Sequence, residues 1–212
     1  MVRNVWKDAE TLTSCKRKRK LGIAQRKIEK GQNMQRKKTS DMVYVGIFAA
    51  LIVLCSWISI PGPVPFTLQT LGVFLTVGLL GGRLGSQAVL VYILMGAIGL
   101  PVFAHFQGGL GTLLGTTGGY ILGFLFSALL MWGMERAFGR SQGVLVLSML
   151  LGLLACYAFG TVWFMRVYLR TTGAVSWMTV LGWCVFPFVV PDAIKIGLAV
   201  WLTGRLKQFV RA

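Results

Sequence analysis

Acidic residues are almost missing from most of this chain. Only six of 212 residues are Asp or Glu, and after residue 42 the only two are Glu135 and Asp192. Histidine occurs once, as His105, and the four cysteines are far apart, without a Cys-x-x-Cys pair. These scarcities argue against paired catalytic carboxylates, a Ser/His/Asp triad and a histidine or cysteine metal centre. We therefore expect no enzymatic activity, no catalytic residues and no metal.

Nucleotide-binding loops are missing as well. No Gly-x-x-x-x-Gly-Lys-Ser/Thr run occurs, so the chain is not expected to hydrolyse ATP by that route. The glycine-rich run at 108–119 does not match Gly-x-Gly-x-x-Gly, and no strand is predicted before it. Its glycines either let backbone N–H groups approach a ligand or allow close helix packing. We expect no cofactor.

Apolar residues dominate what remains. The chain is 55% hydrophobic and 13% charged, with a mean hydropathy of +0.70, which is typical of a membrane protein. The formal charge of +16 would suggest nucleic-acid binding on a soluble surface. However, 13 of the 22 Lys and Arg residues lie within residues 1–40, and most others end apolar runs.

The basic N-terminal segment, residues 1–41, has few large apolar side chains and includes the run Lys16–Lys20. Such a segment cannot bury enough surface to fold alone, so we predict a disordered or loosely helical tail. It could bind anionic lipid or nucleic acid. We favour a cytoplasmic tail that sets the topology, with no nucleic-acid partner.

The remainder, residues 42–212, predicts an all-α membrane protein with six transmembrane helices. The expected spans are about 42–60, 67–81, 84–100, 118–138, 143–169 and from near Pro191 to Arg205. The second and third are shorter than the ~20 residues of a perpendicular span, so neighbours or loops must shield them. Residues 101–117 are expected to form an apolar loop, and Ser176 is expected to cap a short interfacial helix that ends near Trp183.

Basic residues set the orientation of these spans. With both termini inside, the basic tail and most arginines at span ends lie on the cytoplasmic side of a multi-pass cytoplasmic-membrane protein. Arg166 and Arg170 fall outside, where they either attract an anionic ligand or contact lipid headgroups. The Pro-rich run 61–66, the loop 101–117 and the start of the last helix then share the outer face. This arrangement predicts a ligand pocket open to the extracytoplasmic side.

Asp192 and Lys195 are the charges of this outer face that need an explanation. Three residues apart on a helix, they share one side, and each charge costs about 2.5–3.5 kcal/mol at mid-membrane. A polar ligand could complete their environment, or the pair could be structural because Asp is favoured in a first helical turn.

His105, in the outer loop, could touch the ligand or be solvated. Gly115, Gly119 and Gly123 repeat every four residues, which favours close approach of a second helix.

Several separated motifs resemble the BioY family of biotin-uptake proteins. They are Ile60-Pro-Gly-Pro-Val-Pro-Phe-Thr-Leu-Gln-Thr-Leu-Gly72, Gly96-Ala-Ile-Gly-Leu-Pro-Val-Phe-Ala104, the run Gly108–Phe124, and Pro191-Asp-Ala-Ile-Lys195. The likeness covers about residues 42–208. It implies the fold of a substrate-binding S component of an energy-coupling factor (ECF) transporter, which binds biotin from outside and works with a T component and two ABC-type ATPases.

The resemblance also implies roles for individual residues. Asp192 would accept a hydrogen bond from a ureido N–H of biotin, and Lys195 would keep Asp192 ionised or donate to the ligand. Thr67, Gln69 and Tyr120 are implied as further polar contacts. The apolar side chains expected over the thiophene ring and aliphatic tail are Phe66, Phe103 and Leu110. Two alternatives stay open: an S component for another vitamin, or a membrane scaffold with a lipid- or nucleic-acid-binding tail.

Overall fold

A computed structural model describes residues 32, 34–62, 64–173 and 175–210. Most of the predicted basic tail therefore lies outside the described residues. Residues 44–212 form one compact unit, which contains the candidate site described below, and residues 1–43 belong to a separate unit.

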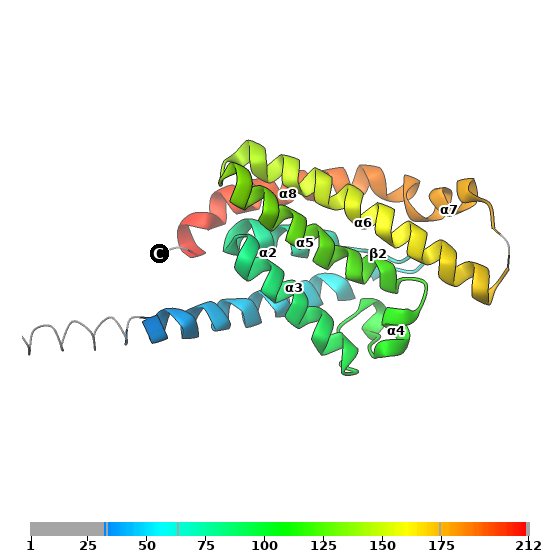
Figure 1. Cartoon of the computed structure of the whole chain (residues 1–212), viewed down its shortest axis with the longest axis horizontal. Coiled ribbons are helices and arrows are strands. Elements are labelled where there is room, and N and C mark those ends of the chain that lie inside the picture. The colour runs from blue at the N-terminus through cyan, green and yellow to red at the C-terminus, as the bar shows by residue number, and fades with distance from the viewer. Residues whose placement is uncertain (1–31, 33, 63, 174, 211–212) are drawn as a thin grey trace, which may run out of the picture. The chain divides into compact units, whose positions relative to one another are not determined.

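The described chain is mostly helical, as predicted (Figure 1). A first helix, Met34–Trp57, is followed by β1 (Ser59–Ile60), β2 (Phe66–Thr67), α2 (Gln69–Leu80), α3 (Gly82–Ala97), the 3₁₀ turn η1 (Ala104–Phe106), α4 (Leu110–Leu114), α5 (Gly118–Phe138), α6 (Gln142–Thr171), α7 (Trp177–Cys184) and α8 (Phe186–Val210). The first helix, α5, α6 and the segment α7–α8 are long and apolar enough to cross a membrane. The chain is thus a multi-pass membrane protein.

Two helices are too short to span a bilayer alone, as the sequence predicted. α2 has 12 residues and α3 has 16, against the ~20 of a perpendicular span. Gly81, with φ +86°, separates them and lets the chain reverse without a longer loop. α2 also packs against α5 and α8, which shields most of its length. Whether all six predicted spans cross the membrane stays a prediction.

The connection after the first helix contains structure that the sequence did not predict. The first helix ends at Trp57 rather than near Ile60, and Ser59 and Ile60 pair antiparallel with Thr67 and Phe66. The prolines between them interrupt the helix, and this short ladder brings the two ends of the Pro-rich run together. Residues 101–117 are also not a simple loop, because they include η1 and α4.

The prediction that the last helix begins near Pro191 was wrong. α8 begins at Phe186, directly after the short helix α7, and Pro191 lies inside it. Pro187 already occupies the first turn, where a missing N–H costs nothing. At Pro191 the missing N–H instead leaves the carbonyl of Pro187 without its usual helical donor. Ser176 occupies the N-cap position of α7, as expected, but its side chain makes no capping hydrogen bond.

Among helices α2 to α8, α5 and α6 share the most extensive contact, and they lie side by side in Figure 1. Their short link places Ser141 at the N-cap of α6, where its Oγ accepts from the Val144 N–H at 3.2 Å. A Cβ at Gly119 would meet the Trp163 side chain, and one at Gly123 would meet Cys156. The predicted close approach at Gly119 and Gly123 is therefore confirmed, whereas Gly115 ends α4 instead.

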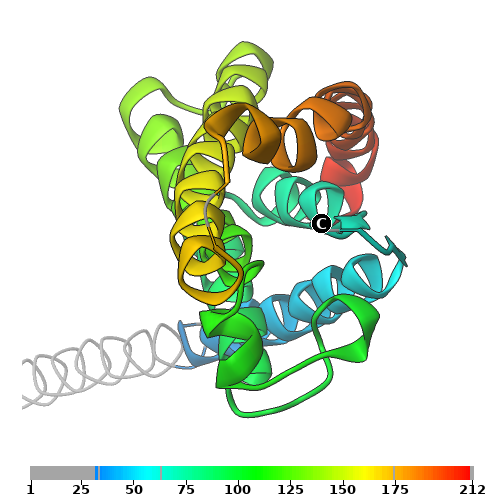
Figure 2. The same cartoon turned by 90° about the vertical axis from the view of Figure 1, so that its right-hand side faces the viewer.

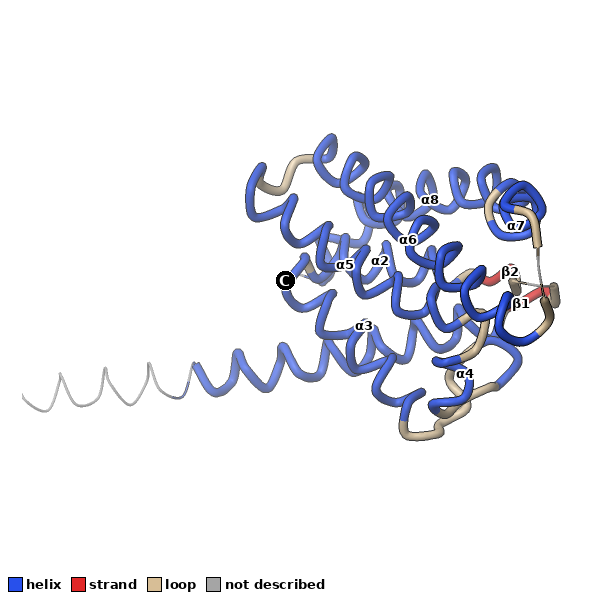
Figure 3. Tube along the Cα trace, turned by 45° about the vertical axis from the view of Figure 1, so that its right-hand side comes forward, coloured by secondary structure: helices blue, strands red, loops and turns tan. Residues whose placement is uncertain are grey.

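The short elements gather at one end of the long helices. Figure 3 shows β1, β2, α4 and α7 at this end, away from the α5–α6 link. Figure 2 looks onto the same end, with α4 low and α7 high in the view. Because the Pro-rich connection, the 101–117 segment and the start of α8 meet here, this end carries the residues predicted to bind a ligand.

Candidate functional site

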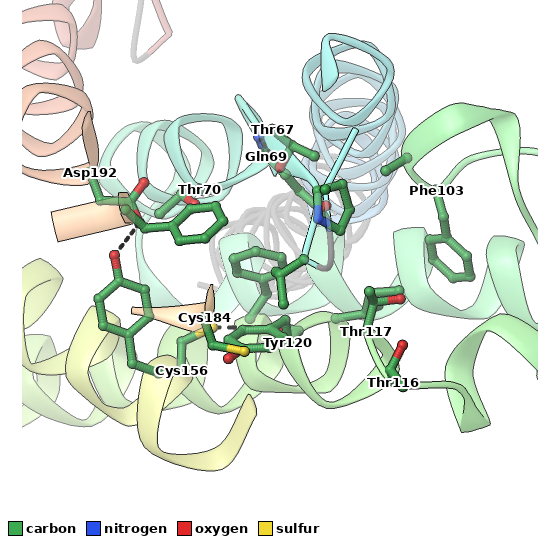
Figure 4. Close-up of a pocket in the computed structure, with 18 of the residues that line it drawn as sticks. Thr67, Gln69, Thr70, Phe103, Thr116, Thr117, Tyr120, Cys156, Cys184 and Asp192 are labelled. Atoms are coloured by element: carbon green, nitrogen blue, oxygen red, sulfur yellow. Dashed lines mark hydrogen bonds between the residues drawn. The ribbon is translucent and has the colours of Figure 1, made fainter. Parts of the chain in front are cut away.

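A cavity of about 310 Å³ opens among these elements. It draws residues from β2, α2, the segment before α5, and helices α5 to α8. Its polar lining residues are Thr67, Gln69, Thr70, His105, Gln107, Thr112, Thr116, Thr117, Tyr120, Tyr157, Asp192 and Lys195. Figure 4 shows how several of them face one another across the space. The volume and the mixed lining suit a small, mostly apolar molecule with a few polar groups.

Asp192 and Lys195 form an ion pair inside the protein. They lie on one face of α8, as predicted, with 2.7 Å between Lys195 Nζ and Asp192 Oδ1. Their residues are only 2% and 5% exposed. An ion pair in such a dry environment needs further hydrogen bonds to offset its desolvation, and both partners have them.

The Lys195 ammonium group has three contacts, one of which is with Asp192. Besides Asp192, Nζ donates to the backbone carbonyl of Thr67 at 2.7 Å and lies 4.1 Å from the centroid of the Phe66 ring. An ammonium group has three N–H donors and no acceptor. One carboxylate, one carbonyl and one aromatic face therefore account for all three protons.

Asp192 is held from a second helix by Tyr157. The Tyr157 hydroxyl donates to Asp192 Oδ2 at 2.5 Å, and Figure 4 marks this bond with a dashed line. Each carboxylate oxygen can accept about two hydrogen bonds, and each here accepts one from the described residues. Sequence reasoning did not identify Tyr157. The available signal was a phenol inside the apolar run of α6, where a hydroxyl needs a partner.

β2 and the start of α2 supply the next polar group. The Gln69 N–H donates to Thr67 Oγ1 at 3.3 Å, and Gln69 Nε2 donates to the Tyr92 hydroxyl at 2.9 Å. These contacts fix a side chain that is only 4% exposed and lines the cavity. With one amide N–H bound to Tyr92, Gln69 keeps its carbonyl oxygen as an acceptor and its second N–H as a donor for a ligand.

Aromatic residues form much of the remaining wall. The Tyr120 hydroxyl lies 2.9 Å from Thr161 Oγ1, and its ring packs against Gly160, where a Cβ would overlap it. Phe103 is 1% exposed and meets Tyr92 edge to face, with 5.6 Å between ring centroids. Phe103 and Tyr120 both line the cavity, as the sequence predicted.

The segment that carries Phe103 and His105 is tied to the first helix. Ser56 Oγ lies 2.5 Å from the Val102 carbonyl, and Trp57 Nε1 donates to the Pro101 carbonyl at 2.9 Å. His105 lies at the mouth of the cavity and has a left-handed backbone, with φ +57°. A non-glycine residue in that region is strained, so these contacts hold a conformation that the chain would not adopt alone.

Two of the predicted contacts lie outside the cavity wall. Phe66 instead covers Lys195 and stacks on Phe188, which does line the cavity. Leu110 is 62% exposed, because α4 buries Leu113 and turns Leu110 and Leu114 outward one helical turn apart. The lining residues that sequence reasoning missed include Thr70, Gln107, Ile121, Phe124, Leu153, Cys156, Tyr157, Cys184 and Phe188.

The chemistry of the polar wall favours a neutral polar group on the part of the ligand that meets it. Asp192 and Lys195 cancel in charge, and the exposed Arg166 and Arg170 do not line the cavity. Among the described residues no three His, Cys, Asp or Glu side chains lie close enough to hold a metal ion. The pocket instead offers carboxylate and amide oxygens at one side and aromatic and aliphatic walls elsewhere. It suits a molecule with N–H donors on an otherwise apolar body.

Comparison with known proteins places this geometry in a family. The chain is 43% identical over 170 residues to the biotin transporter BioY of Thermotoga maritima, covering 79% of this chain and 96% of that protein. It is 38% identical over 171 residues to a probable biotin transporter BioY of Pyrococcus horikoshii, covering 80% of this chain and 98% of that protein.

A solved structure agrees with this relationship. The S-component for biotin from an ECF-type ABC transporter superposes with a TM-score of 0.72 at 26% identity, covering 82% of this chain and 93% of that one. The model of the BioY family matches residues 27–212, which include every element described here. The chain belongs to the BioY family.

Proposed function

We propose that this protein binds biotin and is the substrate-specific subunit of an ECF-type ABC transporter in the cytoplasmic membrane. Its relatives are named biotin transporters, and the related solved structure is an S-component for biotin. The observation that carries the proposal is the buried Asp192–Lys195 pair at the wall of a 310 Å³ cavity.

Asp192 is the main polar contact in this proposal. Its two oxygens each have acceptor capacity left after binding Lys195 and Tyr157, so one can accept from a ureido N–H of biotin. The Gln69 amide oxygen is available for the second ureido N–H. A hydrogen bond to an ionised acceptor is shorter and stronger than a neutral one, which favours Asp192 over Gln69 as the stronger contact.

Lys195 supports Asp192 rather than the ligand. Its three protons face Asp192, the Thr67 carbonyl and the Phe66 ring, so a fourth partner would have to displace one of them. Lys195 therefore keeps Asp192 ionised in a dry site, where an unpaired carboxylate would be strongly disfavoured.

Apolar walls would hold the tetrahydrothiophene ring and aliphatic chain of biotin. Phe103, Ile121, Phe124, Leu153 and Phe188 line the cavity without offering polar groups. Each Å² of apolar ligand surface removed from water contributes about 25 cal/mol, less the cost of immobilising the ligand. His105 and Thr67, which also line the cavity, are proposed as contacts at its mouth and base.

The proposed assembly follows from the ECF class. The chain has no nucleotide-binding loop, so a membrane T component and two ABC-type ATPases would supply energy. The N-in, C-in arrangement of six spans directs the cavity to the extracytoplasmic side, because Arg136, Arg140, Arg205 and Lys207 lie at the opposite helix ends.

Isothermal titration of the purified protein with biotin tests the site. We expect Asp192→Asn and Lys195→Ala each to weaken biotin binding by at least about tenfold, the effect of losing a charge-assisted hydrogen bond. Arg166→Gln, an exposed charge change away from the cavity, should bind as the parent does. Unchanged affinity in both site variants, with folding intact, would defeat the assignment.

Competition separates the other functions. If thiamine or riboflavin displaces or outcompetes biotin, the chain is an S component for another vitamin. If biotin leaves the melting temperature unchanged and deletion of residues 1–41 abolishes function, the chain is a scaffold that acts through its basic tail.

A further inference from the structure

Tyr92 of α3 is fully buried and lies behind two walls of the cavity without lining it. Its hydroxyl accepts from Gln69 Nε2 at 2.9 Å, and its ring meets Phe103 edge to face, with 5.6 Å between the ring centroids. Gln69 begins α2, whereas Phe103 directly precedes η1, and both line the cavity. Tyr92 therefore joins two wall residues that are far apart in the sequence.

The Phe103 side of this arrangement is firmly held. Gly96 lies one turn after Tyr92 on the same face of α3, and a Cβ there would overlap the Phe103 ring. The Gly96 carbonyl accepts from the Gly109 N–H at 2.7 Å, and the Phe103 N–H donates to the Gln107 carbonyl at 2.9 Å. Tyr92 is thus a fixed point against which the Gln69 side chain is oriented.

The direction of the hydrogen bond at the Tyr92 hydroxyl follows from its other neighbour, Ser56, whose side chain lies beside it. Ser56 Oγ is 2.7 Å from the Val53 carbonyl and 2.5 Å from the Val102 carbonyl, and a carbonyl can only accept. The single proton of Ser56 is therefore used, and its oxygen can accept the proton of Tyr92. The Tyr92 oxygen is then left to accept, which requires an N–H from Gln69.

This direction fixes which end of the Gln69 amide faces Tyr92. An amide side chain has an oxygen that only accepts and a nitrogen that only donates. Turning the amide over would set its oxygen against the Tyr92 oxygen, so Tyr92 would have to give up Ser56 to supply a proton. Gln69 is only 4% exposed, so water does not replace a lost partner there. The bond to Tyr92 therefore keeps the Gln69 carbonyl oxygen as an acceptor in the cavity wall.

We propose that Tyr92 is a positioning residue of the binding site, whose hydroxyl holds the Gln69 amide with its carbonyl oxygen ready for an N–H of the ligand. This role rests on the proposed binding of biotin, in which Asp192 accepts one ureido N–H and Gln69 the other. A free amide would spend part of its time with its nitrogen in that place, where it cannot accept. Holding the side chain before the ligand arrives also removes an ordering cost from binding.

A double-mutant cycle, measured by isothermal titration of the full chain with biotin, tests this role. Tyr92→Phe keeps the ring against Phe103 and removes only the hydroxyl, so we expect affinity to fall about fivefold, the effect of one hydrogen bond. Gln69→Leu removes the amide on which Tyr92 acts. In the Gln69→Leu background, Tyr92→Phe should therefore change the affinity by less than about twofold. In a Phe103→Leu background the fivefold loss should persist.

Tyr168→Phe is the matched control, because it removes a hydroxyl that bonds no described residue and should leave biotin affinity unchanged. Equal losses from Tyr92→Phe with and without the Gln69 amide would show that Tyr92 only supports the fold, and would overturn the positioning role while leaving the proposed function intact. A parent that binds no biotin would overturn both.

The double variant covers the case in which Tyr92→Phe alone does not fold. It has no buried amide without a partner, so it lacks the defect that the single variant introduces. Affinities of the double variant and of Gln69→Leu that agree within about twofold support the role. A double variant that binds about fivefold more weakly than Gln69→Leu would contradict it. Melting curves without ligand show that each variant is folded.

Discussion

The hydroxyl of Tyr157 donates to Asp192 Oδ2 across two helices, 35 residues apart in sequence, while Lys195 holds the other carboxylate oxygen from within α8. The carboxylate is therefore fixed from both sides. Its position depends on how α6 and α8 pack, not only on the local spacing of Asp192 and Lys195.

Removing this hydroxyl should weaken biotin binding without unfolding the protein. Tyr157→Phe keeps the ring but releases Asp192 Oδ2, so we expect affinity to fall about tenfold, as for loss of a hydrogen bond to a charged group. Titration calorimetry measures the effect. Tyr168→Phe is the matched control, because the Tyr168 hydroxyl bonds no described residue and its ring stacks on Phe164. Equal affinities for the two variants would show that Tyr157 does not position Asp192.

The two charges of the pair should not contribute independently to stability. Lys195→Met leaves a buried carboxylate without its cation, which costs about 3–5 kcal/mol when a buried pair is broken. The double variant Asp192→Asn/Lys195→Met removes both charges and should recover most of the lost melting temperature while still failing to bind biotin. Differential scanning fluorimetry without ligand makes the comparison. A double variant less stable than Lys195→Met would contradict the argument.

Sequence reasoning identified the charge pair because so few charges occur in the apolar part of the chain. A single Asp three residues before a Lys predicts contact from helix geometry alone, and the 2.7 Å distance bears that out. The family motif led to Thr67, Gln69, Phe103 and Tyr120, all of which line the cavity.

Tertiary packing decided what the sequence could not show. No residue near Tyr157 in the sequence indicates that Asp192 is its partner. The contact forms only when α6 and α8 pack together. Proline is common at helix starts, which favours a start at Pro191, but Pro187 fills that role and the helix continues through Pro191. An apolar loop over residues 101–117 predicts Leu110 over the ligand, but α4 forms within this segment and turns Leu110 outward.

Gly160 should be intolerant of a side chain because it faces the ring of Tyr120. A Cβ at this position would overlap ring atoms, so Gly160→Ala should destabilise the protein by about 1–3 kcal/mol and displace Tyr120 from the cavity wall. Biotin affinity should fall with it. Gly133→Ala in α5 has open space around its Cβ and should be neutral or stabilising by up to ~1 kcal/mol. Thermal melts and titrations of both variants check this, and equal behaviour would contradict it.

Ser56 should control how fast biotin leaves. Its hydroxyl is fully buried and lies 2.5 Å from the Val102 carbonyl, directly before Phe103 in the cavity wall, and 2.7 Å from the Val53 carbonyl of its own helix. Ser56→Ala removes this tie and leaves a buried carbonyl without its donor, at a cost of about 1 kcal/mol. This loss destabilises the segment that carries Phe103 where it covers the cavity. Biotin dissociation should therefore speed up about fivefold, with little change in association. Ser59→Ala is the control, since the Ser59 hydroxyl bonds only Trp57 in its own segment. Stopped-flow displacement of labelled biotin measures both rates, and an unchanged dissociation rate in Ser56→Ala would show that the segment does not hold the ligand.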